Sequence, residues 1–96
     1  MSEPDDNGVD AELVRAIEAM VLVAVEPVAA DLMAQLLEVP TSLVEEVCEQ
    51  LAEAYEAAGH GFQLLKVAGG YRYQTHPDLA QYVERFVLDG QRARLS

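Results

Sequence analysis

Positive charge is what this sequence lacks most. Its 96 residues hold six lysines and arginines against seventeen aspartates and glutamates, which gives a formal net charge of −11. No lysine or arginine lies between Arg15 and Lys66, whereas nine carboxylates fall in that interval. Charge of this sign repels nucleic acid and anionic membranes, so it argues against non-specific binding to either.

The sequence also has one cysteine, no tryptophan and no long apolar run, which limits disulfides and membrane spans. Cys48 is the one cysteine, so an internal disulfide is impossible, and its apolar neighbours favour a buried thiol over a nucleophile. The longest apolar run, residues 19–25, is far shorter than the roughly 18 residues that span a bilayer. The acidic N-terminus has no basic flank typical of a signal peptide, so we expect a cytoplasmic protein.

Apolar residues at helical spacing predict three helices in the first 60 residues. Asp10 is the expected N-cap of the first helix, which should run to about Val25. The second helix is predicted over residues 29–37, with Leu32, Leu36 and Leu37 facing inward and Met33 beside them. The third should begin near Thr41 or Ser42, with a capping box formed by Ser42 and Glu45, and should end at Gly59.

After Gly61 the pattern changes to a hairpin and a closing helix. Residues 62–68 and 71–75 are predicted to be strands joined by a two-residue turn at Gly69-Gly70. This register pairs Ala68 with Tyr71 and places all three aromatic residues of the hairpin on the core-facing side. Pro77 suits the first turn of a last helix capped by Thr75 or His76. Its expected apolar stripe consists of Leu79, Tyr82, Val83 and Phe86, and Asp89-Gly90 should close it.

Three helices, a hairpin and a closing helix are typical of a winged helix-turn-helix. The predicted fold class is therefore mainly α with a small β-hairpin, an α+β winged helix with an additional C-terminal helix. Residues 1–9 should form a disordered acidic tail and residues 10–88 the winged-helix domain. Residues 89–96 look like a linker towards an absent second domain.

The third helix is poorly suited to enter a DNA groove. Phosphate binding needs cations, and the outer positions of this helix carry only Gln50 and five glutamates, Glu45, Glu46, Glu49, Glu53 and Glu56. Lys66 and Arg72 on the hairpin are more typical of ordinary surface residues than of a nucleic-acid site. An acidic transcription regulator that binds DNA through its wing and basic C-terminal residues stays open as an alternative, which a salt-dependent gel shift would test.

Nothing in the pattern indicates catalysis, a metal or a cofactor. His60 and His76 have no cysteine or carboxylate at a recognised ligand spacing, and Gly69-Gly70 opens no helix that could hold a phosphate. The glutamates of the third helix lie on an exposed face, where carboxylates lack the burial that tunes them for acid–base chemistry. We therefore expect no enzyme, no small-molecule substrate and no membrane partner.

A surplus of apolar residues favours a protein–protein interface instead. A domain this small is unlikely to bury every apolar residue of the first helix and of the second hairpin face together. The candidate interface residues are Val14, Leu22, Val25, Leu65, Val67 and Arg72. The hypothesis is self-association through the first helix and the hairpin.

Several segments resemble a known family. Leu13 to Ala19, Val23 to Val28, and Val67 to Tyr71 followed by Thr75-His76-Pro77 are similar to segregation and condensation protein B. The combination of Glu26-Pro27-Val28 with Val67-Ala68-Gly69-Gly70-Tyr71 is more specific than either segment alone. The resemblance extends from about Leu13 to Val87.

The resemblance implies a non-catalytic role in the bacterial condensin that compacts and segregates chromosomes. Members have two winged-helix domains and form homodimers. They bind the kleisin subunit, segregation and condensation protein A, and through it they join the SMC ATPase. It also implies that this chain is the first domain alone, placed on the nucleoid through the complex. The lack of cations, in turn, predicts no direct DNA binding by this domain.

Overall fold

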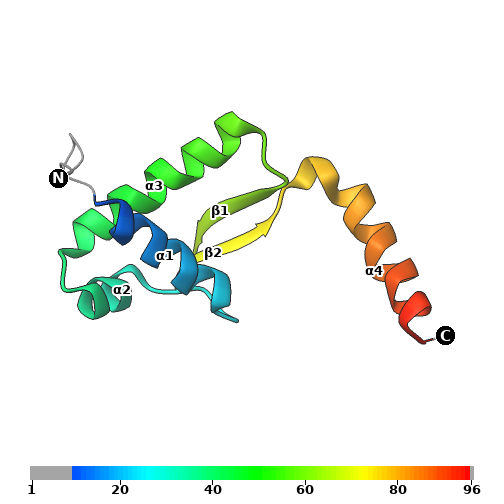
Figure 1. Ribbon diagram of the computed structural model, residues 1–96, viewed down its shortest axis with the longest axis horizontal. Helices are drawn as coiled ribbons and strands as arrows, with labels where there is room; N and C mark the ends of the chain where they lie inside the picture. Colours follow the sequence, from blue (N-terminus) through cyan, green and yellow to red (C-terminus); the bar gives the residue numbers. More distant parts are fainter. Residues whose placement is uncertain (1–9, 96) are drawn as a thin grey trace.

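The fold is a body of three helices and a two-stranded hairpin, from which a last helix projects (Figure 1). The computed structural model describes residues 10–95, and side chains for residues 10–90. The elements in chain order are α1 (Ala11–Val23), α2 (Ala30–Leu37), α3 (Thr41–Ala58), β1 (Phe62–Val67), β2 (Gly70–Thr75), the 3-10 turn η1 (Pro77–Leu79) and α4 (Ala80–Leu95). This order confirms the α+β winged helix with an added helix. The predicted disordered tail, residues 1–9, lies outside the described residues.

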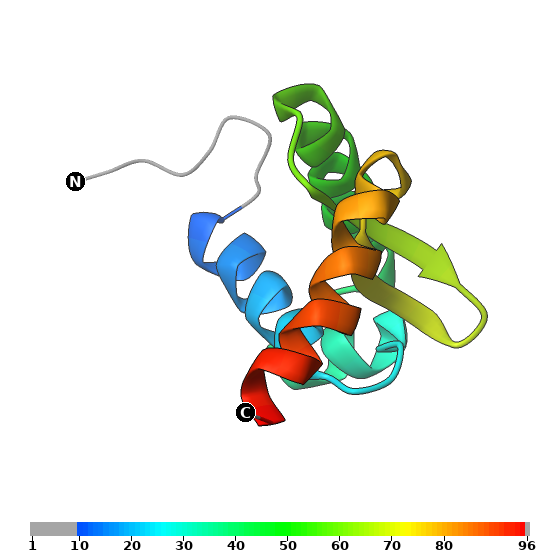
Figure 2. The same ribbon diagram turned by 90° about the vertical axis from the view of Figure 1, so that its right-hand side faces the viewer.

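The core lies where α1, α2, α3 and the hairpin meet. When the molecule is viewed along its long axis, α1 and the tip of the hairpin lie on opposite sides of the body (Figure 2). The buried residues come from all of these elements and are Ile17, Val21, Met33, Ala34, Val44, Val47, Cys48, Tyr55, Leu64 and Tyr71. The thiol of Cys48 is buried, as predicted, and burial raises its pKa to about 11.

The first two helices differ from the prediction at their ends and on one face. The side chain of Asp10 accepts a hydrogen bond from the Glu12 amide and caps α1, as predicted. α1 ends at Val23 rather than near Val25, because Ala24 has extended backbone that starts the connection to α2. The inward placement of Leu32 and Leu36 is wrong, since their exposed fractions are 49% and 61%. Leu37 packs partly buried against the core, as predicted, beside the buried Met33 and Ala34.

The predicted capping box at the start of α3 is also wrong. The N-cap is Pro40, and no side chain caps the helix. Glu38 adopts the left-handed conformation that ends α2, and the fixed φ of Pro40 then lets α3 begin at Thr41. Ser42 consequently lies inside the first turn. The predicted stop at Gly59 is confirmed, with a left-handed φ of 73°.

The hairpin has the predicted faces but not the predicted register. Phe62 pairs with Thr75 and Val67 with Gly70, so the two-residue turn consists of Ala68 and Gly69. The shift relative to the predicted pairing is two residues, and side chains alternate with a period of two, so each residue keeps its face. Leu64 and Tyr71 are accordingly buried against the helices. Gly70 lies within β2, where the lack of a Cβ lets Val28 approach.

A short bridge joins the α1–α2 connection to the hairpin. The amide of Val28 donates to the Tyr71 carbonyl at 2.8 Å, and the Tyr71 amide donates to the Val28 carbonyl at 2.9 Å. Val28 therefore acts as a one-residue third strand beside β2. This contact positions α1 against the hairpin.

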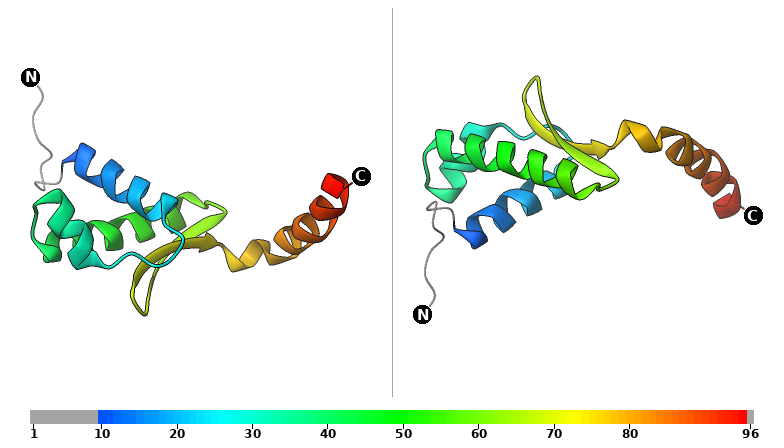
Figure 3. Two further views of the ribbon diagram at one scale, coloured as in Figure 1. Left: turned by 90° about the horizontal axis from the view of Figure 1, so that it is seen from below. Right: turned by 90° about the horizontal axis from the view of Figure 1, so that it is seen from above.

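The last helix begins as predicted but neither ends nor packs as predicted. His76 is the N-cap of η1, Pro77 follows it, and α4 then runs through Gly90 to Leu95. The expected stripe does not pack on the body, because α4 leaves it beyond the hairpin (Figures 1 and 3). Tyr82 and Phe86 keep exposed fractions of 59% and 75%. The assignment of residues 89–96 as a linker to a second domain stays a prediction.

A candidate protein-interaction groove

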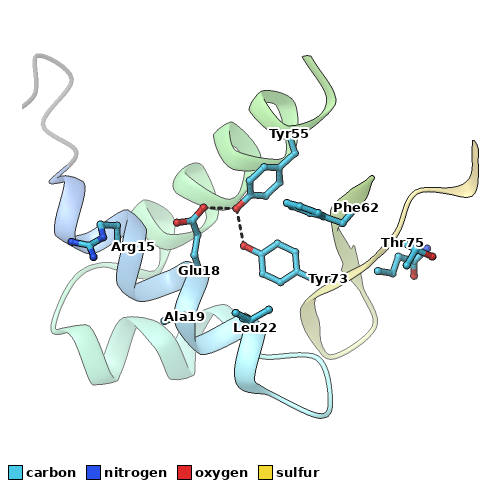
Figure 4. Close-up of a pocket in the computed structure, with 9 residues that line it drawn as sticks. Arg15, Glu18, Ala19, Leu22, Tyr55, Phe62, Tyr73 and Thr75 are labelled. Carbon is cyan, nitrogen blue, oxygen red and sulfur yellow. Dashed lines mark hydrogen bonds between the residues drawn. The ribbon is translucent and has the colours of Figure 1, made fainter. Parts of the chain in front are cut away.

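An open groove of about 730 Å³ lies between α1, the end of α3 and the hairpin (Figure 4). Its lining residues are Arg15, Glu18, Ala19, Leu22, Tyr55, Phe62, Tyr73, Gln74 and Thr75. These nine residues define the extent of the groove. Most of the lining is apolar or aromatic, which is typical of a surface that another molecule covers.

One face of α1 forms one wall of the groove. Arg15, Glu18, Ala19 and Leu22 recur at the i, i+3, i+4 and i+7 spacing that aligns side chains along a helix. The buried stripe of α1, at Ile17 and Val21, lies on another arc of the same helix. The groove wall is therefore a separate surface, and Leu22 is 75% exposed there.

Aromatic rings form the opposite wall. The rings of Tyr55 and Phe62 meet edge to face with centroids 5.0 Å apart, and those of Phe62 and Tyr73 do so at 5.8 Å. His60 stacks on the outer side of Phe62, also at 5.0 Å. Ring pairs of this geometry stabilise one another beyond the area they bury. The wall is therefore a fixed surface.

A chain of hydrogen bonds ties the two walls together. The Tyr55 hydroxyl donates to Oε2 of Glu18 at 2.5 Å, which leaves the Tyr73 hydroxyl to donate to the Tyr55 oxygen at 2.7 Å. Burial and then the hydrogen bond to Glu18 raise the pKa of Tyr55 well above its ordinary value. Both hydroxyls thus stay protonated and hold α1 at a set distance from the hairpin.

Removing the Tyr55 hydroxyl should destabilise the domain measurably. Tyr55→Phe leaves Glu18 without its donor and Tyr73 without its acceptor, so we expect a loss of about 1–2 kcal/mol in the free energy of unfolding. Thermal and urea unfolding measure it. Tyr82→Phe, on the exposed α4, is the matched control and should leave stability unchanged. Equal effects of the two substitutions would contradict the proposed bridge.

His76 holds the end of the groove where α4 begins. Its Nδ1 accepts from the Asp78 amide at 3.1 Å, so the ring proton lies on Nε2, which is 3.2 Å from Oε1 of Glu56. The His76 amide donates to the Gly61 carbonyl at 2.8 Å. These contacts tie the start of η1 to α3 and to the residue before β1, and so set the direction in which α4 leaves.

The predicted interface residues do not lie together on one surface in the structure. Leu22 lines the groove, whereas Val25 is 98% exposed in the connection after α1. Val14 is half-buried against the core. The remaining three are on the other hairpin face: Leu65 and Val67 half-buried, and Arg72 exposed with its guanidinium donating to Gln74. Their role as an interface stays a prediction.

Sequence reasoning missed the groove because it assigned the hairpin aromatics to the core. Phe62 is in fact 40% exposed, and Tyr73 is half-buried. The spacing of Arg15, Glu18 and Leu22 along α1 was a usable signal, since it marks a second helical face beside the core stripe. The partnership of Glu18 with Tyr55, 37 positions apart, had no signal in the sequence.

Other kinds of site find little support among the described residues. Within residues 10–95, no three histidine, cysteine, aspartate or glutamate side chains come together as a metal site would require. In the same part of the chain, no helix combines the length and the hydropathy needed to cross a bilayer.

Comparison with known proteins identifies the family. Residues 15–96 match the family model described as "Segregation and condensation complex subunit ScpB". The chain belongs to this family. Segregation and condensation protein B of Moorella thermoacetica is 39% identical over 69 residues, which cover 72% of this chain. That match covers 35% of the Moorella protein, so the chain spans about a third of the length of this ScpB relative.

Solved ScpB structures share the fold. The ScpB crystal structure from Mycobacterium tuberculosis is 32% identical, has a TM-score of 0.79, and matches 94% of this chain and 54% of that chain. A dimer of a ScpB N-terminal domain complexed with a ScpA peptide has a TM-score of 0.72 at 22% identity. The match covers 78% of this chain and 87% of that ScpB domain. The family expected from the sequence is therefore confirmed.

Proposed function

We propose that this domain is a non-catalytic interaction subunit of the SMC–kleisin complex that condenses and segregates bacterial chromosomes. In this role it associates with a second copy of itself and contributes to binding of the kleisin ScpA, and it meets the SMC ATPase only through that kleisin. Membership of the ScpB family supports the assignment, as does the fold shared with a ScpB domain solved as a dimer with a ScpA peptide. A role on the bacterial chromosome implies a cytoplasmic location.

The single observation that carries the proposal is the groove. It is open, largely apolar and lined by side chains from α1, α3 and the hairpin. Its polar groups, Glu18, Tyr55 and Tyr73, are hydrogen-bonded to one another and so serve to fix its shape. A concave apolar surface with its polar groups already paired suits a protein partner better than a reaction.

The charge of α3 supports a protein partner over DNA. Its outer face carries the five glutamates identified in the sequence, and four of them, Glu46, Glu49, Glu53 and Glu56, are exposed. Carboxylates held against phosphates would repel them at close range. The regulator alternative is not favoured, because the family matches are to condensation proteins.

Light scattering on this chain, alone and with purified ScpA, tests the proposal. We expect the mass of a dimer at micromolar concentration and a larger complex when ScpA is added. Leu22→Glu should weaken association about tenfold or more, since burial of one leucine contributes about 1.5–3 kcal/mol. Val23→Glu is the matched control, because Val23 is 80% exposed, adjacent to Leu22 and outside the groove.

Two results would refute this proposal. A monomer that does not bind ScpA at high micromolar concentration would refute the function itself. Equal loss of association in Leu22→Glu and Val23→Glu would refute the groove as its site.

A further inference from the structure

We propose that the groove holds helix α4 of a second copy of this chain, so that two chains exchange their last helices. The inference rests on the self-association proposed above and specifies which segment makes it. In this arrangement each α4 leaves its own body and lies against α1 and the hairpin of its partner.

The first support is that α4 carries an apolar stripe that the described part of its own chain leaves largely uncovered. Tyr82, Phe86 and Val87 are 59%, 75% and 48% exposed. Their spacing, together with half-buried Leu79 and Val83, puts them along one side of the helix. Within its own chain α4 packs chiefly against η1. A helix with one apolar side and no partner favours burial against another surface.

The second support is that α4 cannot reach its own groove without breaking contacts that hold it away. Thr75, at the edge of the groove, is two residues before Pro77. His76 between them is tied to Glu56 and Gly61, and α4 then extends away from α1 (Figures 1 and 3). The exposed stripe of one chain can therefore contact an open groove only on a second chain.

The third support is that the two surfaces match in chemistry. The groove offers Leu22 and the aromatic wall to an apolar stripe. Arg85 lies one residue before Phe86, at the edge of the stripe, and Glu18 in the groove keeps a second carboxylate oxygen that can accept from it.

The symmetry of a dimer fits this exchange. A twofold interface uses the same patch on both subunits, so one chain must carry both the surface and its complement. Here the groove and the α4 stripe lie on one chain. A dimer with a single twofold axis therefore fills both grooves and covers both stripes.

Cross-linking between two single-cysteine chains tests the exchange. Leu22→Cys chains are mixed and equilibrated with Phe86→Cys chains, then treated with a short bismaleimide, whose reach tolerates geometry that a direct disulfide would not. Both sites are exposed, so neither change should disturb folding. The buried thiol of Cys48 should react slowly, and the unmodified chain measures that background.

The matched control is Leu88→Cys, on the same helix. Leu88 is 60% exposed and lies two residues beyond Phe86, so it points nearly opposite. We expect the mixture of Leu22→Cys and Phe86→Cys to give at least about tenfold more cross-linked pairs than that of Leu22→Cys and Leu88→Cys, since docking raises the local thiol concentration towards millimolar.

The outcomes separate this inference from the proposed function. Preferential cross-linking through Phe86 supports the exchange. A dimer by light scattering with no preference for Phe86 overturns the exchange, leaves the proposed function standing and frees the groove for ScpA. A monomer overturns the exchange together with the proposed self-association.

Discussion

Gly70→Ala is expected to lower the free energy of unfolding by about 3 kcal/mol or more, the largest loss we expect from a single added methyl group. A Cβ at this position would lie 2.1 Å from the Val28 oxygen and 2.7 Å from the Ala29 nitrogen. Real Cβ atoms do not approach backbone this closely, so Val28 must move away from β2. The two hydrogen bonds between Val28 and Tyr71 would then lengthen or break.

Backbone strain adds to the steric overlap at Gly70. Its φ is 139°, a conformation that residues with a Cβ rarely adopt. Each kcal/mol corresponds to about 4–8 °C in a domain of this size, so the melting temperature should fall by more than 10 °C. Gly61→Ala is the matched control, since a Cβ there meets nothing within 4 Å. A similar melting temperature for the two variants would contradict the role assigned to the Val28 bridge.

The same glycine shows how far the hairpin could be predicted. Alternation of side chains placed Leu64 and Tyr71 on the core-facing side correctly, because that pattern depends only on parity along a strand. The register depended on which residue must approach Val28, a contact between segments about 40 positions apart. No local pattern carries that information, so the turn was placed at Gly69-Gly70 instead of Ala68-Gly69.

The last helix shows a second limit of prediction. The spacing of Tyr82, Val83 and Phe86 identified an amphipathic helix, and the helix exists. The same spacing led to the expectation that its stripe joins the core of its own chain. An apolar stripe shows that a helix needs a covering surface and does not show which chain supplies it. The side-chain contacts at His76, which direct α4 away from the body, decide this point.

The groove was predictable only in part. Leu22 was recognised as apolar surface in excess of what a small core can bury, and it does line the groove. The opposite wall was missed, because aromatic residues on a core-facing strand are usually buried. Here the body buries Leu64 and Tyr71 but leaves Phe62, the first residue of β1, 40% exposed.

Raising the pH above about 9 should destabilise this domain through its buried acidic groups. Burial raises the pKa of Cys48 to about 11, with the charges of Glu45 and Glu49 adding to the effect. In the unfolded chain the thiol ionises near pH 8.5. The native state therefore holds this proton more tightly, so the stabilisation is complete below about pH 8.5 and is lost as the pH rises towards 11. The loss is on the order of 3 kcal/mol.

Ionisation of buried tyrosines extends this loss of stability to higher pH. The pKa values of Tyr55, Tyr71 and Tyr73 are all raised, in each case chiefly by burial. Unfolded tyrosine ionises near pH 10, so above that pH deprotonation favours the unfolded chain at three further positions. Urea unfolding from pH 7 to pH 11 should show a plateau to about pH 8.5, a first decline, and a steeper one above about pH 10.

The variant Cys48→Ala separates the thiol and tyrosine phases of the decline in stability with rising pH. Without the thiol, the stability between about pH 8.5 and pH 10 should stay level, while the tyrosine phase above that range persists. The comparison uses the change with pH within each variant, because loss of the sulfur from a packed site lowers stability at every pH. Unchanged pH dependence in Cys48→Ala would mean that the thiol is accessible to water in the native state. That result would contradict the burial of Cys48 in the core, on which the pKa shift depends.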